Sequence, residues 1–228
     1  MKSFVWLDDK SKKLTYWNRN YYFVTTVLIV ILNIVLFAAW DKPRISVSPH
    51  WGSFSVVNLV QALINTYWHV NWQHILLNML CFLIAGLYLE RKKGSLKFFL
   101  FVVILSLFTA FAVCANEVAL GWTGFSGMNY GLYGYILIEL VFMLFQKEKR
   151  YLFNLICGGA IYALIYFAMC FNGGTSRIGF EWYPYDLLHN LGHASGFVTG
   201  LAFGVYEQAC ALISRHKAKD KKSERSES

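Results

Sequence analysis

The sequence is poor in charge and in proline. Only 15% of its 228 residues are charged and only three are proline, whereas 57% are apolar. A soluble globular domain carries about 25% charged residues, so this composition argues against a soluble protein. The apolar residues fall in long blocks and lack the alternation of a β-barrel wall. The remaining class is a helical membrane protein.

The chain also lacks a C-x-x-C motif. Its five cysteines all fall within apolar blocks. Isolated cysteines in such blocks are typical of small core residues. We therefore predict no metal or redox centre built on cysteine.

Six apolar runs lie close to the ~20 residues that span a bilayer as a helix. We predict an all-α membrane protein, a six-helix bundle that forms one domain over 21–213, with tails at 1–20 and 214–228. Mixed charges and serines predict disorder over 215–228. The first run lacks a small-residue cleavage site and is predicted to be the first helix and not a signal peptide. The six runs are 21–39, 73–89, 95–115, 126–146, 151–171 and 187–213.

The basic residues are distributed unevenly between these runs. If the N-terminus is cytoplasmic, 18 of the 21 lysines and arginines lie on the cytoplasmic side, in the two tails, 90–97 and 147–150. This asymmetry predicts that both termini are cytoplasmic. The net charge of +8 is then explained by the orientation of the protein in the membrane and by contact of its basic residues with anionic lipid headgroups. We expect no nucleic-acid partner.

The outer segment 40–72 is unusually apolar for a connection. We expect it to lie in the membrane interface, where tryptophan and tyrosine are favoured, or to fold back on the bundle. No internal repeat is evident, which disfavours a transporter built from inverted halves.

A few polar residues lie inside or beside the spans, where they are costly and usually functional. With cytoplasmic termini, the second, fourth and sixth runs all begin at the outer surface. Four of the polar residues then share one depth, which favours a common site: His74, Asn78, Ser126 and His193. The others are His69, Asn129, Glu139, His189 and Asn190.

Glycines at four-residue spacing indicate which helices meet. Gly127 and Gly131 lie in the fourth run, and the sixth carries Gly192, Gly196, Gly200 and Gly204. Small residues at this spacing let membrane helices approach closely. We infer that the two helices touch along these glycines and bring Ser126 and His193 together.

A serine and a histidine form a sufficient core for acyl transfer. A neutral imidazole within ~3 Å can take the proton of the hydroxyl nucleophile. Glu139 is about 20 Å further along its helix, so we predict a dyad without a carboxylate, with Glu139 paired or snorkelling near the inner side. His74 and Asn78, on one helix face, are candidate oxyanion donors with the backbone N–H of Ser126.

These residues resemble the rhomboid intramembrane serine proteases. The matching segments occur in the order of that family and extend over roughly 20–213. They are His69-x4-His74-x3-Asn78 with Glu90 and Gly94, Gly124-Phe125-Ser126-Gly127 with Tyr130, and His193-x2-Gly196-x3-Gly200.

The resemblance implies a six-helix rhomboid-like bundle that cleaves single-span membrane proteins in or near their span, without a cofactor, in a bacterial-type cell membrane. It implies that Ser126 is the nucleophile, that His193 is the base, and that His74 and Asn78 help form the oxyanion hole. Phe125 is placed with the oxyanion and substrate residues, and Glu90 looks structural. Supporting positions are Tyr130, which packs on the catalytic histidine, with Gly124, Gly127, Gly196 and Gly200.

Other interpretations stay open. A catalytically inactive rhomboid-like protein would only bind membrane clients. His189 and His193, one turn apart, could bind zinc with His69 or His74, although the chain has no H-E-x-x-H motif. A channel or transporter is disfavoured because the polar residues cluster in one leaflet. Val60-Gln61 departs from the Trp-Arg pair of many rhomboids, and no role is assigned to the loop 172–186, to Asn129 or to Glu139.

Overall fold

The described part of the chain is built from helices. A computed structural model describes residues 23–39, 56–114, 124–145, 156, 158–164 and 191–227, with side chains up to Ser214. The elements are α1 (Val24–Ala39), α2 (Val56–Thr66), α3 (Trp72–Lys93), α4 (Ser95–Cys114), α5 (Ser126–Leu144) and α8 (Leu191–Glu227). A further short helical stretch covers 158–164. The prediction of an all-α protein is confirmed over these ranges.

Four of these helices are long and apolar enough to cross a membrane. They are α3, α4, α5 and the Leu191–Ser214 part of α8. The chain is therefore an integral membrane protein. Helix α1 is shorter, at 16 residues, and the fifth predicted run is described only in part. The count of six spans stays a prediction.

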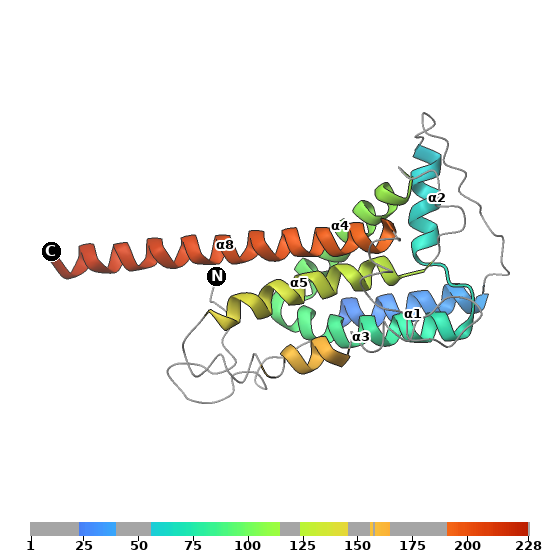
Figure 1. Cartoon of the computed structure of the whole chain (residues 1–228), viewed down its shortest axis with the longest axis horizontal. Helices are drawn as coiled ribbons and strands as arrows, with labels where there is room; N and C mark the ends of the chain where they lie inside the picture. Colours follow the sequence, from blue (N-terminus) through green and yellow to red (C-terminus); the bar gives the residue numbers. More distant parts are fainter. Residues whose placement is uncertain are drawn as a thin grey trace.

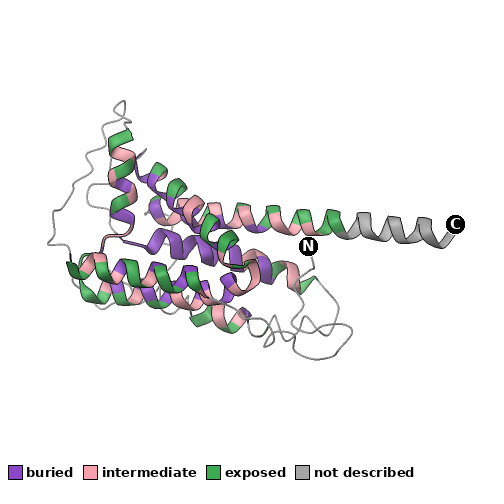
Figure 2. Ribbon diagram, turned by 180° about the vertical axis from the view of Figure 1, so that it is seen from behind, coloured by how far each residue is buried: buried purple, intermediate pink, exposed green. Residues whose placement is uncertain are grey.

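Helix α5 lies at the centre of the bundle. It contacts α3, α4 and α8, and α3, α5 and α8 all begin at the same end of the molecule (Figure 1). Every residue from Ser126 to Ile136 is buried, and α5 is accordingly the most continuously buried helix (Figure 2). A helix surrounded in this way has its rotation and depth fixed by several neighbours.

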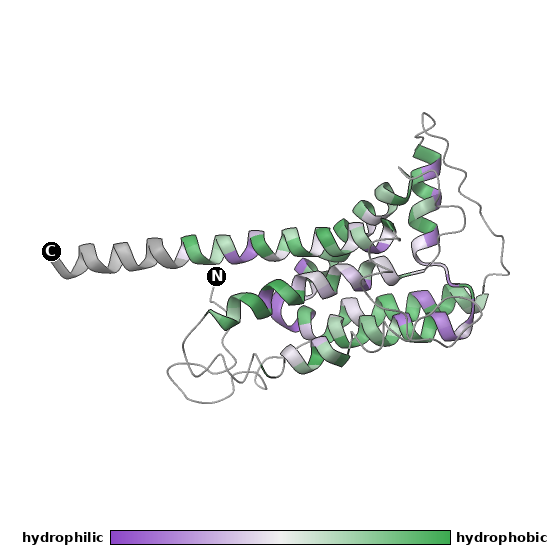
Figure 3. Ribbon diagram, in the orientation of Figure 1, coloured by the Kyte–Doolittle hydropathy of each residue, from purple (hydrophilic) through white to green (hydrophobic). Residues whose placement is uncertain are grey.

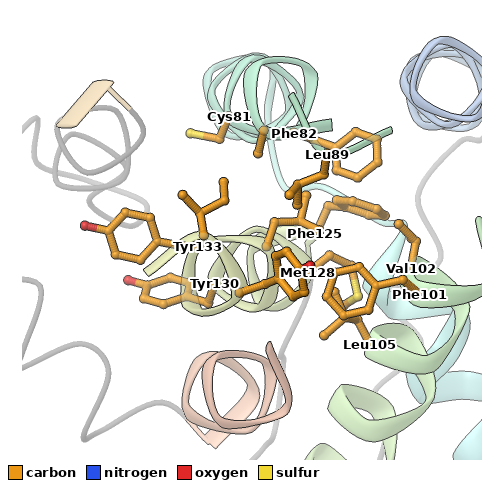
Figure 4. Packing of buried hydrophobic residues seen from close by; sticks show 14 of the residues in the cluster. Cys81, Phe82, Leu89, Phe101, Val102, Leu105, Phe125, Met128, Tyr130 and Tyr133 are labelled. Atoms are coloured by element: carbon orange, nitrogen blue, oxygen red, sulfur yellow. The ribbon is translucent and has the colours of Figure 1, made fainter. Parts of the chain in front are cut away.

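Aromatic and aliphatic side chains, most of them from α3, α4 and α5, fill the core. Phe82 of α3, Phe101 and Leu105 of α4, and Met128 and Tyr133 of α5 belong to one buried cluster (Figure 4). The outer faces of the helices are also apolar (Figure 3), and they include large exposed residues such as those of α4, Phe99, Leu100, Leu107, Phe108 and Phe111. An apolar exterior around a packed core is expected where the solvent is lipid.

The described part of the outer segment 40–72 folds back on the bundle. Helix α2 lies within it and stands across the end of the other helices (Figure 1). Ala62 of α2 packs with Ala110, Val113 and Cys114 of α4. The carbonyl of Asn65, near the end of α2, accepts a hydrogen bond from the N–H of Gly124 at 3.0 Å. This contact ties the outer segment to the turn that precedes α5.

Glu90 connects α3 to the beginning of α1. Its carboxylate accepts hydrogen bonds from the N–H groups of Thr25 and Thr26, at 2.9 and 2.8 Å, and from the Thr26 hydroxyl at 2.6 Å. The first N–H groups of a helix have no partner within it and attract negative charge. A structural role, as the resemblance implied for Glu90, agrees with these contacts.

Two ion pairs join α3 to its neighbours, one buried on both sides and one with a partly exposed carboxylate. Lys92 lies 2.6 Å from Glu139 of α5, and Lys93 lies 2.6 Å from Glu207 of α8. The hydroxyl of Tyr135 also donates to Glu207 at 2.5 Å. The prediction that Glu139 pairs with another group, away from the serine, is confirmed.

The C-terminal segment is helical, so the prediction of disorder over 215–228 was wrong for 215–227. Helix α8 continues without a break to Glu227 and extends beyond the other helices (Figure 1). The chain contains no glycine or proline after Gly204, and alanine, lysine, arginine and glutamate are strong helix formers. Mixed charge alone is therefore not sufficient to predict disorder in this segment.

Candidate active site

A glycine turn places Ser126 at the first position of α5. Gly124 has φ of 114°, a left-handed conformation that favours glycine. A Cβ atom on Gly124 would lie only 2.6 Å from Cε1 of His74. Glycine is therefore required here both by the backbone conformation and by the close approach of the His74 ring. The turn delivers the hydroxyl of Ser126 to the N-terminus of a buried helix.

The Ser126 hydroxyl meets the imidazole of His193. The distance from Ser126 Oγ to His193 Nε2 is 2.6 Å, which is within the range for direct proton transfer. Ser126 is 5% exposed, and His193 is half-buried on the first turn of α8. The structure thus brings together two residues that lie 67 positions apart in the sequence.

Contact between glycines makes this distance possible. A Cβ on Gly196 would overlap the carbonyl oxygen of Gly127, and a Cβ on Gly200 would overlap that of Gly131. The backbones of α5 and α8 therefore touch directly, as the glycine spacing predicted. Any larger side chain at these positions would separate the two helices.

Stacking orients the histidine ring. The ring of Tyr130, one turn after Ser126, is nearly parallel to the His193 imidazole, with centroids 4.2 Å apart and 13° between the planes. The carboxylates among the described side chains are engaged elsewhere, in capping α1 and in the two ion pairs. Within the described part of the chain, the arrangement is a dyad supported by an aromatic ring.

His74 and Asn78 line the α3 side of the site. The backbone N–H of His74 donates to the side chain of Asn71 at 2.8 Å, which caps α3. The side-chain nitrogen of Asn78 donates to the His74 carbonyl at 3.1 Å. The His74 ring lies beside Gly124, two residues before Ser126. The His74 ring therefore lies at the start of α5, and Asn78 is bonded to His74 one turn further along α3; their role as oxyanion donors stays a prediction.

Asn129 is a part of the site to which sequence reasoning gave no role. Its side-chain nitrogen donates to both the backbone carbonyl and the side-chain oxygen of Asn78, each at 3.0 Å. The available signal was its position three residues after Ser126, which places both residues on one helix face. The sequence alone gave no indication of which residue it would contact.

His69 is a buried neighbour of the site. Its ring lies 5.1 Å from that of His74, and its Nε2 accepts a long hydrogen bond, 3.4 Å, from the N–H of Phe125. Burial, with a further contribution from nearby His74, lowers the pKa of His69 from 6.5 to about 3. His69 is thus neutral near pH 7 and can act as the acceptor for this N–H.

The ring of Phe125 points into the core. It is fully buried and packs edge-on against Phe82 and Tyr67, at centroid distances of 4.8 and 5.4 Å. These contacts anchor the turn before Ser126 in the core, and the grouping of Phe125 with the oxyanion and substrate residues stays a prediction. Three other features of the sequence interpretation, His189, Asn190 and the loop 172–186, lie outside the described residues.

Comparison with known proteins points to the family that the sequence motifs resemble. A family model described as the rhomboid domain matches residues 57–209, which is more than half of the chain. The rhomboid protease GlpG of Haemophilus influenzae is 30% identical over 141 residues, an alignment that covers 61% of this chain and 65% of that protein. The chain thus matches just under two thirds of the length of this curated relative.

Proposed function

Because the chain belongs to the rhomboid family, we propose that it is an intramembrane serine endopeptidase that uses a Ser126–His193 dyad. The observation that carries the proposal is the 2.6 Å distance between Ser126 Oγ and His193 Nε2. The two residues lie on helices long and apolar enough to cross a membrane. The similarity to a rhomboid protease supports the same activity.

The first chemical step is acylation of the serine. His193 Nε2 takes the hydroxyl proton as Ser126 Oγ attacks the carbonyl carbon of the scissile peptide bond. The resulting tetrahedral intermediate carries a negative charge on the former carbonyl oxygen. His193 then gives the proton to the amide nitrogen, the C–N bond breaks, and the new N-terminus leaves. The other half of the substrate is held as an ester on Ser126.

Donors around Ser126 stabilise the charged intermediate. The backbone N–H of Ser126 is at the N-terminus of α5, where the helix dipole favours negative charge. The His74 ring and the second hydrogen of the Asn78 amide are the side-chain donors on the opposite wall. Preorganised donors of this kind contribute about 3 kcal/mol each to transition-state stabilisation.

Water completes the reaction. His193 removes a proton from a water molecule as the oxygen of that water attacks the ester carbon. The ester bond to Ser126 then breaks as His193 returns the proton to Oγ. The partial exposure of His193 gives water a route to the base, although Ser126 itself is nearly covered.

The substrates that fit this site are single-span membrane proteins. A transmembrane peptide is helical because lipid offers its backbone no hydrogen bonds, so the scissile bond must be unwound before attack. The site lies at the first turns of three helices that start at one end of the bundle, which the positive-inside rule assigns to the outer surface. Cleavage is then expected near the outer end of the substrate span, in a bacterial-type cell membrane, with both termini of the enzyme cytoplasmic.

Incubation of purified protein with a model single-span substrate tests the function. Wild type should cleave in detergent and in liposomes, and Ser126→Ala and His193→Ala should not, with folding retained in each. A fluorophosphonate probe should label wild type and not Ser126→Ala. Labelling that persists in Ser126→Ala would refute the nucleophile assignment. Substrate capture by wild type without cleavage would instead favour the client-binding alternative.

A further inference from the structure

Asn129 and Asn78 form a buried amide pair next to the dyad. Both side chains are almost fully buried, with exposed fractions of 2% and 1%. Asn129 Nδ2 donates to the Asn78 carbonyl oxygen and to Asn78 Oδ1, each at 3.0 Å. One side chain on α5 therefore holds both the backbone and the side chain of Asn78 on α3.

The bonds to Asn129 and His74 fix the orientation of the Asn78 amide, with its oxygen toward Asn129 and its nitrogen toward the His74 carbonyl. Asn78 Oδ1 accepts from Asn129, and Asn78 Nδ2 donates to the carbonyl of His74 at 3.1 Å. If the amide were reversed, its nitrogen would face the nitrogen of Asn129 and its oxygen would face the carbonyl oxygen of His74. Both contacts would then be repulsive, because each would join two donors or two acceptors.

The held orientation leaves one donor of Asn78 available. An amide nitrogen carries two hydrogens, and the bond to His74 uses one. Asn129 lies one turn after Ser126 on the same face of α5, and His74 lies one turn before Asn78 on α3, with its ring beside Gly124. Asn78 is thus bonded to the α5 face that carries Ser126 through Asn129, and to His74, whose ring lies at the turn before that serine, through its own nitrogen.

We propose that Asn129 is a positioning residue, which acts through Asn78 to keep that amide's nitrogen facing the reaction centre. This inference rests on the proposed function, because the held nitrogen matters only if an oxyanion forms beside Ser126. Asn129 itself does not touch the reacting atoms. Its side-chain oxygen has no hydrogen-bond partner, so its two bonds to Asn78 are the specific polar contacts it makes.

The expected kinetic signature separates positioning from simple packing. A misaligned donor weakens the transition state and leaves ground-state binding of substrate unchanged. Asn129→Leu, of similar volume but without donors, should lower kcat by about 10- to 100-fold. KM should change by less than about twofold, because the substrate makes no contact with Asn129.

A double-mutant cycle with Asn78→Ala is the decisive experiment. If Asn129 acts through Asn78, Asn129→Leu should add less than about twofold to the loss already caused by Asn78→Ala. Asn129→Ala replaces the leucine variant if the latter does not fold, since it removes the same donor without adding bulk. Thermal unfolding in detergent identifies variants that fold.

Asn33→Leu is the matched control. Asn33 is also a fully buried asparagine in a membrane helix, whose nitrogen bonds the carbonyl of Ile29 at 2.9 Å. It lies on α1, away from the dyad, so the same chemical change there should leave kcat within about twofold of wild type.

Three results would overturn the inference. One is normal kcat in Asn129→Leu while wild type cleaves. Another is an equal loss from Asn129→Leu in wild-type and Asn78→Ala backgrounds, which would show that Asn129 does not act through Asn78. The last is a wild type that neither cleaves substrate nor reacts with the fluorophosphonate. This result would overturn the proposed function as well, and it is recognised because no variant shows cleavage or labelling either.

Discussion

Replacement of Gly196 by alanine tests whether helix contact sets the geometry of the dyad. The alanine Cβ would overlap the carbonyl oxygen of Gly127 and lie 2.9 Å from its carbonyl carbon. Nonbonded carbon atoms prefer separations of ~3.5–4.0 Å, so α5 and α8 must move apart by at least about 0.6 Å. Gly127 follows Ser126 directly, and Gly196 is three residues from His193.

That displacement is large compared with the tolerance of the proton transfer. The Oγ to Nε2 distance of 2.6 Å would increase toward or beyond the ~3.2 Å limit of direct proton transfer. A misplacement near 1 Å can reduce turnover by about 100-fold. We therefore expect Gly196→Ala to lose about 10- to 100-fold in kcat and to unfold at a lower temperature.

Gly159→Ala is the matched control for this substitution. A Cβ at Gly159 would meet nothing within 4 Å, and alanine stabilises a helix relative to glycine by about 0.5–1 kcal/mol. The control should keep full activity and equal or higher stability. Cleavage of a model single-span substrate and thermal unfolding in the same detergent measure both effects. Wild-type cleavage by Gly196→Ala would refute the argument that glycine contact positions the dyad.

Three further predictions concern groups outside the dyad. Glu139→Gln should cost about 3 kcal/mol of unfolding free energy, because it removes the negative charge that balances the buried ammonium of Lys92. Glu90→Gln should cost roughly 2–3 kcal/mol, because the new amide turns a donor toward the N–H groups of α1. Stability should also fall as the pH drops from about 6.5 toward 3, by at most ~1.4 kcal/mol per pH unit for His69, because the unfolded chain takes up a proton that the buried ring does not.

Each of these predictions has its own control. Replacing Lys92 and Glu139 together by methionine and leucine should recover most of the stability lost in Glu139→Gln, and no recovery would contradict the pairing. Thr26→Val removes one bond to Glu90 and should cost only about 1 kcal/mol. His69→Gln should flatten the acid dependence of stability, and an unchanged slope would show that another group is responsible. Thermal or denaturant unfolding in detergent across a pH series measures all of them.

The helical architecture could be predicted well from the sequence. Apolar runs placed α3, α4 and α5 within a few residues, because a helix in lipid needs a nearly continuous apolar surface. The helix α2 and the helical end of α8 were missed. Segment 40–72 was expected to lie in the membrane interface or to fold back on the bundle, but no helix was predicted there. The mixed charges after Ser214 predicted disorder, although both segments contain good helix formers.

The partners of the polar residues were harder to predict. Glycine spacing identified the contact between α5 and α8, and hence the meeting of Ser126 with His193, because small residues leave a recognisable periodic pattern. No comparable pattern links Asn129 to Asn78 or Glu90 to Thr26. Such bonds depend on the rotation and depth of two helices at once, and a single helix sequence does not encode those quantities.

The sequence by itself determined the membrane class, most of the long helices and the candidate residues for acyl transfer. These properties follow from local composition and periodicity, since each span must satisfy its own backbone and expose apolar side chains to lipid. Only the tertiary structure decided the distances and the orientations. Close packing of α5 between α3, α4 and α8 selected which amide bonds Asn129 and which ring stacks on His193, because those contacts join residues that lie far apart along the chain.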